Sequence, residues 1–393
     1  MVKNWDFDRT VRCSSFETPE GAEEYFLTFS NLKSKSFNGS IVELSAKYQS
    51  IAAHLGLSDD TVVFSRLHLS DIINQKDLLV KSELFQYLRH GVISVIEQHP
   101  LTDDFLVLFS YHVKPKAGRL KKEFLDEKTN PWHKAITVQG KHYSMLWSSD
   151  SAGAGPIDSK QQTNLLLKSF STFLGRNNLN MRNNLVRTWI FVRDVDNHYA
   201  GMVEARKEFF HSQGLCGDSR FVASTGIEGR GDVTGSLVAM DSLSLGNIDE
   251  EQISKINAPD HLPPTMLYGV TFERGLKVRF GDRSHLMISG TASIDADGKV
   301  AHEGDIEKQA LRTIDNVEAL LRGQGANLSD MAYVLCYMRN HKDFDCVQEI
   351  LESRLSKNIP IIAVEAAVCR PAWLFEMEGL AIVADSSRFP PFM

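Results

Sequence analysis

The same order of predicted elements occurs three times along this chain of 393 residues. In the last third, residues 285–294 predict a strand, because apolar and small side chains alternate there. Asp305 is a suitable N-cap for a helix that ends near Arg322, with one apolar face. A strand over 331–340, a helix from about Phe344 to Ser356 and two strands over 361–370 and 374–383 complete the set.

The middle and first thirds repeat this order, the first more loosely. In the middle, we predict strands over 142–150, 185–194, 220–229 and 233–243 and helices over 160–174 and 199–213. In the first third, we predict strands over 23–30, 62–71, 93–98 and 105–113 and helices over 41–55 and 78–88. Three repetitions predict three tandem α/β (α+β) units, because repeated element order indicates repeated structural units.

The unit boundaries are expected where composition changes. A charged stretch over 114–134 and a Pro-containing stretch over 247–264 are typical of linkers. We therefore expect units over 1–134, 135–250 and 251–393. The chain length is consistent with two or three such units, since about 150 residues form a typical domain.

Composition excludes several classes of protein. Lys and Arg total 43 against 50 Asp and Glu, a net charge of −7, which argues against nucleic acid as the main partner.

We expect no membrane span, because no apolar run approaches about 20 residues, and the first residues show no secretory signal. The cysteines are five and form no CxxC, so we expect neither disulfides nor a thiol metal site, and a cytoplasmic location. No metal or phosphate-loop motif occurs, so we expect no cofactor.

The third unit resembles the YjgF/Rid superfamily, also called the endoribonuclease L-PSP family. The resemblance rests on Ser289-Gly290-Thr291 after the first strand, on GANLSD (325–330), and on VEAAVCRPAWLFEMEG (364–379). It implies six-stranded mixed sheets, each with two helices on one face, and three units joined around a barrel-like core with ligand sites at the seams. Either one chain supplies all three units, as an intrachain pseudo-trimer, or the protein forms a homotrimer through one unit.

Residues 135–393 resemble a narrower group, the chorismatases, which release pyruvate from chorismate and carry two such units. The matching stretches are residues 186–194, 203–210, 222–229, 271–294 and 368–379. Residues 1–134 lie outside this resemblance, so a complete additional unit is a departure from that family. We expect this first unit to have a structural role.

Glu376 is the leading catalytic candidate. Its position between Phe375 and Met377 on a strand predicts desolvation and a raised pKa, which suits an acid or base near neutral pH. Glu378, two residues on, shares its face and is expected to serve the same site. The resemblance implies that the first glutamate of this pair acts on water or on a proton. The alternative is that both simply occupy the polar face of a strand.

Arg370 and Cys369 follow the strand that begins at residue 361. A guanidinium there could hold a carboxylate through two hydrogen bonds, or it could be an exposed turn residue. Cys369 is expected to be a small wall residue of a substrate site, because no His partner is visible to activate it.

The chorismatase resemblance implies roles for Arg187, Tyr199 and Arg206 in binding substrate carboxylates. Tyr199 and Arg206 lie seven residues apart, so both can face one side of a helix. Ordinary solvent-facing charges are the alternative. Small polar strand ends complete the candidate site, either as ligand contacts or as tight sheet packing: Ser224, Thr225, Ser289, Gly290 and Thr291.

These residues together lead to a hypothesis of a cofactor-free, metal-free enzyme whose partner is a small carboxylated metabolite. The chorismatase-like form would release pyruvate from chorismate or a related ring acid. Hydrolysis of enamines or imines is the second hypothesis. Simple Rid deaminases hold the substrate carboxylate with an arginine at the position occupied here by the segment 360–362, where no arginine occurs. A non-catalytic ligand-binding protein is the third hypothesis.

Overall fold

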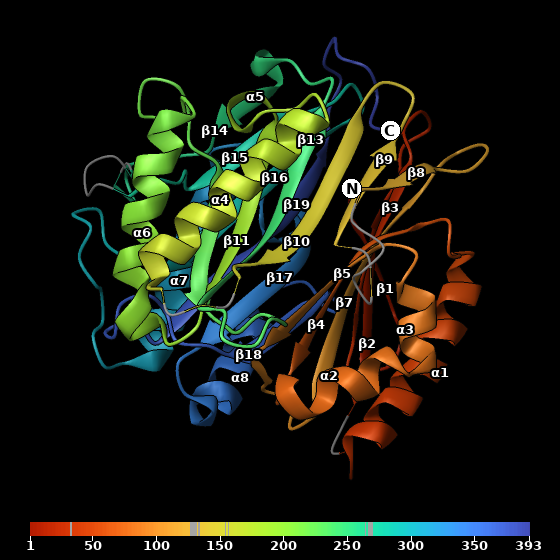
Figure 1. Cartoon of the computed structure of the whole chain (residues 1–393), viewed down its shortest axis with the longest axis horizontal. Coiled ribbons are helices and arrows are strands. Elements are labelled where there is room, and N and C mark those ends of the chain that lie inside the picture. The colour runs from red at the N-terminus through yellow and green to blue at the C-terminus, as the bar shows by residue number, and fades with distance from the viewer. Residues whose placement is uncertain are drawn as a thin grey trace.

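The computed structural model describes residues 1–393 except 32–33, 126–131, 133, 154, 156, 264 and 266–269. Parts of both expected linkers, residues 126–131, 133 and 264, therefore lie outside the described residues. The remaining chain forms three mixed sheets with helices packed against them (Figure 1). The α+β class with tandem units is therefore confirmed, whereas the unit boundaries remain a prediction.

The first sheet has the strand order β1-β2-β3-β7-β4-β5, and only β4 and β5 are parallel. The helix expected over 78–88 is wrong: two short helices cover this region, because the side chain of Ser82 caps a new helix by accepting from the backbone N–H of Phe85. The elements are β1 (Lys3–Trp5), β2 (Val11–Phe16), β3 (Glu23–Phe29), α1 (Phe37–Leu55), β4 (Val62–Leu69), α2 (Ile72–Val80), α3 (Glu83–Leu88), β5 (Val92–Glu97) and β7 (Leu106–Lys114).

The second sheet has the order β12-β11-β13-β10-β9-β8, with β11 and β12 parallel. Its helices α4 and α6 pack against one face through an apolar cluster, and Asp158 caps α4. The elements are β8 (Lys121–Phe124), β9 (Ala135–Gln139), β10 (Ser144–Ser151), α4 (Ser159–Arg176), α5 (Met181–Asn184), β11 (Leu185–Val192), α6 (Val195–Ser212), β12 (Ala223–Glu228) and β13 (Val238–Gly246).

The third sheet has the order β14-β15-β16-β19-β17-β18-β6, so it contains seven strands rather than the expected six. The additional strand β6 (His99–Pro100) comes from the first third of the chain. Asp305 caps α7 as expected, by accepting from the Lys308 backbone N–H. The remaining elements are η1 (Glu250–Gln252), β14 (Ile253–Lys255), β15 (Gly275–Arg279), β16 (Arg283–Ala292), α7 (Ile306–Arg322), η3 (Leu328–Asp330), β17 (Met331–Met338), η4 (His341–Asp343), α8 (Phe344–Arg354), β18 (Ile361–Glu365) and β19 (Phe375–Ala384).

The backbone irregularities of the three sheets confirm the internal repetition. In each sheet the strand after the first helix is bulged at the same place against its antiparallel partner: between Val62 and Phe64, between Leu185 and Arg187, and between Met331 and Tyr333. These bulges give a common register for comparing the sheets. Bulges are specific local features, so three in corresponding positions indicate a shared unit.

The inner faces of the sheets share one apolar interior. Alternation along β4 sends Phe64 and Arg66 inward, while Leu67 and Leu69 pack under the helices. Trp147 stacks on Phe64 with ring centroids 4.5 Å apart. No sheet closes on itself among the described residues, so the structure shows three sheets around an interior rather than a closed barrel.

Each pair of sheets meets along a seam. At the first–second seam β5 contacts β10, and at the second–third seam β12 contacts β16. At the third–first seam β18 pairs with β6 and β17 contacts β2.

Across each seam, one buried arginine binds one buried carboxylate. Arg66 and Asp241 join the first and second sheets, with N and O atoms 2.7 Å apart. Arg187 and Glu378 join the second and third sheets. Arg283 and Glu24 join the third and first sheets at 2.8 Å.

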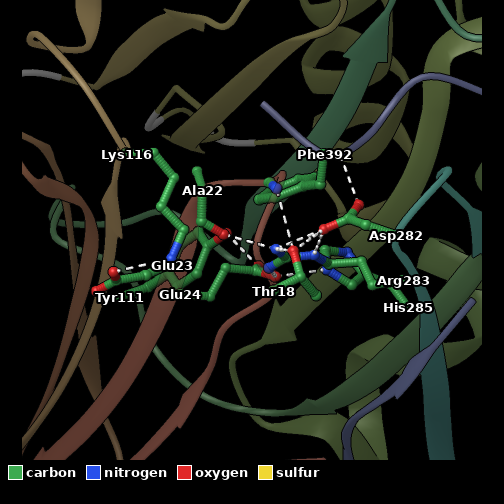
Figure 2. A network of polar contacts seen from close by, with 11 residues as sticks. Thr18, Ala22, Glu23, Glu24, Tyr111, Lys116, Asp282, Arg283, His285 and Phe392 are labelled. Atoms are coloured by element: carbon green, nitrogen blue, oxygen red, sulfur yellow. Dashed lines mark hydrogen bonds and ion pairs between the residues drawn. The ribbon is translucent and has the colours of Figure 1, made fainter.

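The Glu24 carboxylate lies in a wider network of polar contacts around the Arg283 pair (Figure 2). It also accepts hydrogen bonds from the Tyr111 hydroxyl at 2.7 Å and His285 at 2.9 Å. Burial raises the pKa of Glu24, but His285 and Arg283 outweigh burial and lower it to about 2. The carboxylate is therefore ionised across the physiological pH range.

None of the helices in the described part of the chain is both long and apolar enough to cross a membrane.

Breaking one seam pair tests its energetic role. Arg66→Met should lower the free energy of unfolding by about 3–5 kcal/mol, because Asp241 would remain as an uncompensated buried charge. Arg66→Met combined with Asp241→Leu should recover most of that loss. Chemical unfolding followed by circular dichroism measures both variants. A single variant as stable as the double variant would contradict this account.

Candidate active site

A cavity of about 80 Å³ lies at the second–third seam and gathers most of the predicted site residues. Those that line it are Tyr199, Arg206, Ser224, Thr225, Gly290, Cys369, Arg370 and Glu376. The cavity wall also contains Gly226, which follows the candidates Ser224 and Thr225 on the same strand end, and residues that sequence reasoning did not select: Val270, Phe272, Arg274, Ala292, Ile294 and Trp373. Glu378, Arg187, Ser289 and Thr291 are not among the cavity-lining residues.

Glu376 lies on β19 and is 5% exposed. Burial, with a further contribution from the negative charge of Glu378, raises its pKa from 4.5 to about 8, although Arg187 and Arg274 oppose this rise. A Cβ atom at Gly290 would lie 2.2 Å from Glu376 Oε1, so only glycine leaves room for this carboxyl group. At neutral pH Glu376 is therefore a protonated acid facing the cavity.

Glu378 lies two residues after Glu376 on β19, outside the cavity, and both of its carboxylate oxygens accept hydrogen bonds from neighbouring side chains. Its Oε1 accepts from Trp189 Nε1 at 2.7 Å and from the Tyr337 hydroxyl at 3.0 Å. Its Oε2 accepts from Arg187 and from the Thr225 hydroxyl. With two donors on each oxygen, Glu378 is fixed in place, and its contacts are structural and electrostatic.

Arg206 and Tyr199 project from α6 into the cavity, as their spacing predicted. Arg206 is 1% exposed; its Nε donates to Thr271 Oγ1 at 3.0 Å and its Nη1 to Ser224 Oγ at 3.4 Å. Its Nη2 is buried and has no hydrogen-bond partner among the described residues. A buried guanidinium with an unused donor can bind a ligand oxygen.

Cys369 is a wall residue beside Tyr199. Burial, followed by the charge of Glu376, raises the pKa of the Cys369 thiol to about 12. Burial also raises the pKa of Tyr199. Both groups are therefore protonated at neutral pH, which disfavours a cysteine nucleophile.

Arg370 and Trp373 lie in the segment between β18 and β19. The strand expected over 361–370 is wrong in its second half, because β18 ends at Glu365. The Arg370 guanidinium lies 4.7 Å from the Trp373 ring centroid, and Trp373 Nε1 donates to the Ser293 carbonyl at 3.0 Å. Arg370 is exposed, so it lies where solvent reaches the cavity.

Arg274 is the main cavity residue that sequence reasoning missed. It precedes β15 and is 4% exposed. Burial lowers its pKa to about 10, while the charge of Glu376 raises it. The only sequence feature that could have identified Arg274 as a site residue was its position within residues 271–294, one of the stretches that resemble chorismatases.

The small polar residues join the two sheets at this seam. The Ser289 hydroxyl accepts from the Ser224 backbone N–H at 2.9 Å and donates to the Glu273 carbonyl at 2.7 Å. Thr225 Oγ1 accepts from the Gly290 backbone N–H at 3.0 Å and from Arg187 at 2.8 Å. Thr291 donates to the Ser289 carbonyl at 2.9 Å. Ser289 and Thr291 thus bind other protein groups, whereas Ser224 and Thr225 also border the cavity.

No group of three or more His, Cys, Asp or Glu side chains among the described residues could hold a metal ion.

Comparison with known proteins identifies the protein family to which the chain belongs. The family model "Endoribonuclease L-PSP" matches residues 278–383. A RutC family protein of Pyrococcus abyssi is 31% identical over 97 residues, which are 24% of this chain and 76% of that protein. The chain therefore belongs to this YjgF/Rid (endoribonuclease L-PSP) family, as its motifs predicted.

Within the family, the chain resembles chorismatases. It is 26% identical over 218 residues to a 3-hydroxybenzoate synthase of Streptomyces hygroscopicus, covering 50% of this chain and 63% of that protein. A chorismatase of the same organism is 25% identical over 216 residues, 61% of its length. These matches thus span less than two thirds of either relative. A crystal structure of a chorismatase shares the fold, with a TM-score of 0.59 and 18% identity over 82% of this chain and 93% of that one.

Replacement of Glu376 tests its protonation. Because its folded-state pKa is raised, the folded protein binds more protons than the unfolded chain between about pH 4.5 and 8, so stability falls as pH rises through this window. Glu376→Gln removes this dependence. We expect the variant to be more stable than the wild type at pH 8 by about 4 kcal/mol, because a shift of one pKa unit corresponds to about 1.4 kcal/mol, and equal to it near pH 4.

Glu378→Gln is the matched control, because it leaves Arg187 without a countercharge and should destabilise the protein by about 3 kcal/mol. Urea unfolding at several pH values measures both variants. A Glu376→Gln variant whose stability follows that of the wild type at every pH would show that Glu376 is ionised in the folded protein.

Proposed function

We propose that this protein is a chorismatase-like enzyme that releases pyruvate from chorismate or a related enol-pyruvyl ring acid. The observation that carries the proposal is the buried, protonated Glu376 in a cavity bordered by Arg206, Arg274 and Arg370. One acid with three guanidinium groups suits a substrate that has two carboxylates and an acid-labile bond. The similarity to 3-hydroxybenzoate synthase and to chorismatases supports the same substrate class.

The proposed chemistry begins with proton transfer from Glu376 to the methylene carbon of the enol ether. This leaves a positive charge shared by the adjacent carbon and the ether oxygen, and a negative charge on Glu376. Water can then add to that carbon, and the product collapses to pyruvate and a ring alcohol. Alternatively, the C–O bond to the ring breaks as a ring proton is lost, which gives pyruvate and an aromatic ring. In both routes the Glu376 carboxylate recovers a proton.

Substrate binding is assigned to the arginines and the hydroxyl groups. Arg206 offers its unused Nη2, and Arg274 lies beside Glu376, so these two would hold a carboxylate near the acid. Arg370 on Trp373 would hold the second carboxylate at the entrance. Tyr199, Ser224 and Thr225 would contact the ring substituents. Burial and the charge of Glu378 together keep Glu376 protonated, so we assign Glu378 a positioning role.

The first unit is assigned a structural role. The residues that line the cavity are numbered 199–376, so none comes from the first third of the chain. This third instead supplies one of the three sheets around the interior. We therefore propose that one cytoplasmic chain acts as an intrachain pseudo-trimer, without a homotrimer.

Turnover of chorismate is the primary test. The wild type should release pyruvate, and Glu376→Gln should lower kcat by about 10²–10⁴-fold, because an amide cannot donate the proton. A coupled lactate dehydrogenase assay with the folded variants measures pyruvate. A wild type that leaves chorismate intact but hydrolyses an imine or enamine would replace this proposal with the deaminase function.

Activity should depend on pH through the same acid. The rate should be level below about pH 7 and fall as Glu376 ionises near pH 8. Initial rates from pH 5 to 10 measure this dependence. A rate that rises above pH 8 would instead indicate that Glu376 acts as a base.

Replacement of Arg206 tests substrate binding. Arg206→Met should chiefly raise KM, by about 10- to 100-fold, through loss of a charged hydrogen bond. Initial rates over a series of substrate concentrations measure this KM.

A further inference from the structure

The cavity of the candidate active site has two walls that belong to different sheets. Helix α6, which packs on the second sheet, carries Tyr199 and Arg206. The segment 366–374, which connects β18 and β19 of the third sheet, carries Cys369 and Arg370. This segment is irregular, so its position relative to α6 depends on individual contacts across the second–third seam.

Arg339, the residue after β17, holds the irregular segment at two points. Its backbone N–H donates to the Leu374 carbonyl at 3.1 Å, and its Nη2 donates to the Val368 carbonyl at 2.6 Å. The carbonyl of the preceding residue, Met338, accepts from the Ala366 N–H at 2.8 Å. The start, the middle and the end of the segment are therefore all attached to the end of β17.

The same guanidinium also binds the first turn of α6. Arg339 Nη1 donates to Asp196 Oδ2 at 2.8 Å, and Nη2 donates to Asp196 Oδ1 at 3.0 Å. Two parallel hydrogen bonds fix the direction of a carboxylate as well as its distance. The hydrogen bond from Arg339 lowers the pKa of Asp196, which is therefore ionised at neutral pH. Asp196 precedes Tyr199 by three residues, about one helical turn.

A separate contact holds α6 on its own sheet. The side chain of Asp194, the N-cap residue, makes no capping hydrogen bond. Glu228 at the end of β12 instead accepts from the backbone N–H groups of Asp194 and Val195, at 2.8 and 2.6 Å. Loss of Arg339 would therefore leave α6 capped and attached to β12, while its link to the segment 366–374 would be released.

Arg339 and Asp196 both lie outside the cavity. Neither residue is part of the cavity lining, and their side chains are 21% and 45% exposed. Glu376 is held by different contacts, because β19 pairs with β16 and β17 on either side of it. A change at Arg339 should therefore affect the groups on the two walls more than the acid.

We infer that Arg339 is a positioning residue of the candidate active site. It ties α6 to the segment 366–374, so that Tyr199 and Arg206 on one wall face Arg370 on the other. Its loss should weaken substrate binding and leave proton transfer by the acid in place. This kinetic expectation rests on the proposed function, whereas the connection between the two walls does not.

Alkylation of Cys369 tests this connection without any assumption about the substrate. Cys369 is half-buried and follows Val368, whose carbonyl binds Arg339. Arg339→Met should raise the rate of Cys369 alkylation by N-ethylmaleimide at pH 8 by about tenfold, because an ion pair and a charged hydrogen bond are lost. The rates at the half-buried Cys216 and Cys346 should stay unchanged. Peptide mass spectrometry of the labelled full chain distinguishes the three cysteines.

Further variants separate the pair from a general effect of mutation. Arg339→Lys should give a smaller rise, because lysine keeps the charge but loses the planar fork. Asp196→Asn should also raise Cys369 alkylation, and its combination with Arg339→Met should add little to Arg339→Met alone, because both act on one interaction. Arg354→Met is the matched control: it removes a half-buried arginine that binds Asp315 at 2.8 Å, and it should leave Cys369 unchanged.

Chorismate kinetics test the positioning role. Arg339→Met should raise KM by about 5- to 10-fold, since the carboxylate-binding groups are less well placed. Its kcat, and the fall in rate as Glu376 ionises near pH 8, should match those of the wild type. A lower kcat with an unchanged KM would overturn the inference.

Two alkylation results would also overturn it. One is equal labelling of Cys369 in the wild type and in Arg339→Met. The other is an equal rise at Cys216, Cys346 and Cys369, which would indicate general loosening of the fold. A wild type that leaves chorismate intact would reject the proposed function alone, and the alkylation rates would still decide whether Arg339 holds the two walls together.

Discussion

Three buried arginine–carboxylate pairs connect the three sheets of this protein. Arg66–Asp241, Arg187–Glu378 and Arg283–Glu24 each join a different pair of sheets, and all six side chains are almost fully buried. A buried charge is tolerated only with its partner in place, so each pair fixes how two sheets meet. The Glu24 network shows how completely such a charge is satisfied, with Arg283, His285 and Tyr111 around one carboxylate (Figure 2).

One of these pairs also sets the electrostatics of the candidate active site. Glu378 forms a buried ion pair with Arg187, and its charge lies next to Glu376 on the same strand face. Together with burial, this charge keeps Glu376 protonated near neutral pH. The interaction that joins the second and third sheets therefore also prepares the proposed acid, and the two roles cannot be separated by mutation of Glu378 alone.

The three seams show how one repeated unit has diverged. One seam carries Glu376 with its arginines, one carries the internal Lys134–Asp232 pair, and one borders a cleft whose walls include Arg12 and Val107. A seam between repeats can vary in this way because its residues come from two units and need only preserve the pairing of the sheets. The chemistry of the protein thus depends on a few side chains at seams, while the shared core maintains the fold.

The sequence alone determined most of the element order, the threefold repetition and the family, and it selected Glu376 as the leading catalytic candidate, because these depend on local periodicity, capping and short motifs. It also placed Tyr199 and Arg206 on one helix face, since a spacing of seven residues spans two turns. Only the tertiary structure decided that Arg274 and Trp373 join the site, that Glu378 is locked by Trp189 and Tyr337, and that β6 extends the third sheet. Each of these contacts joins residues that are distant in the chain or that lie across a seam. Local sequence pattern carries no record of which distant surfaces meet, because that is decided by the packing of the sheets and by the buried charges that must find partners.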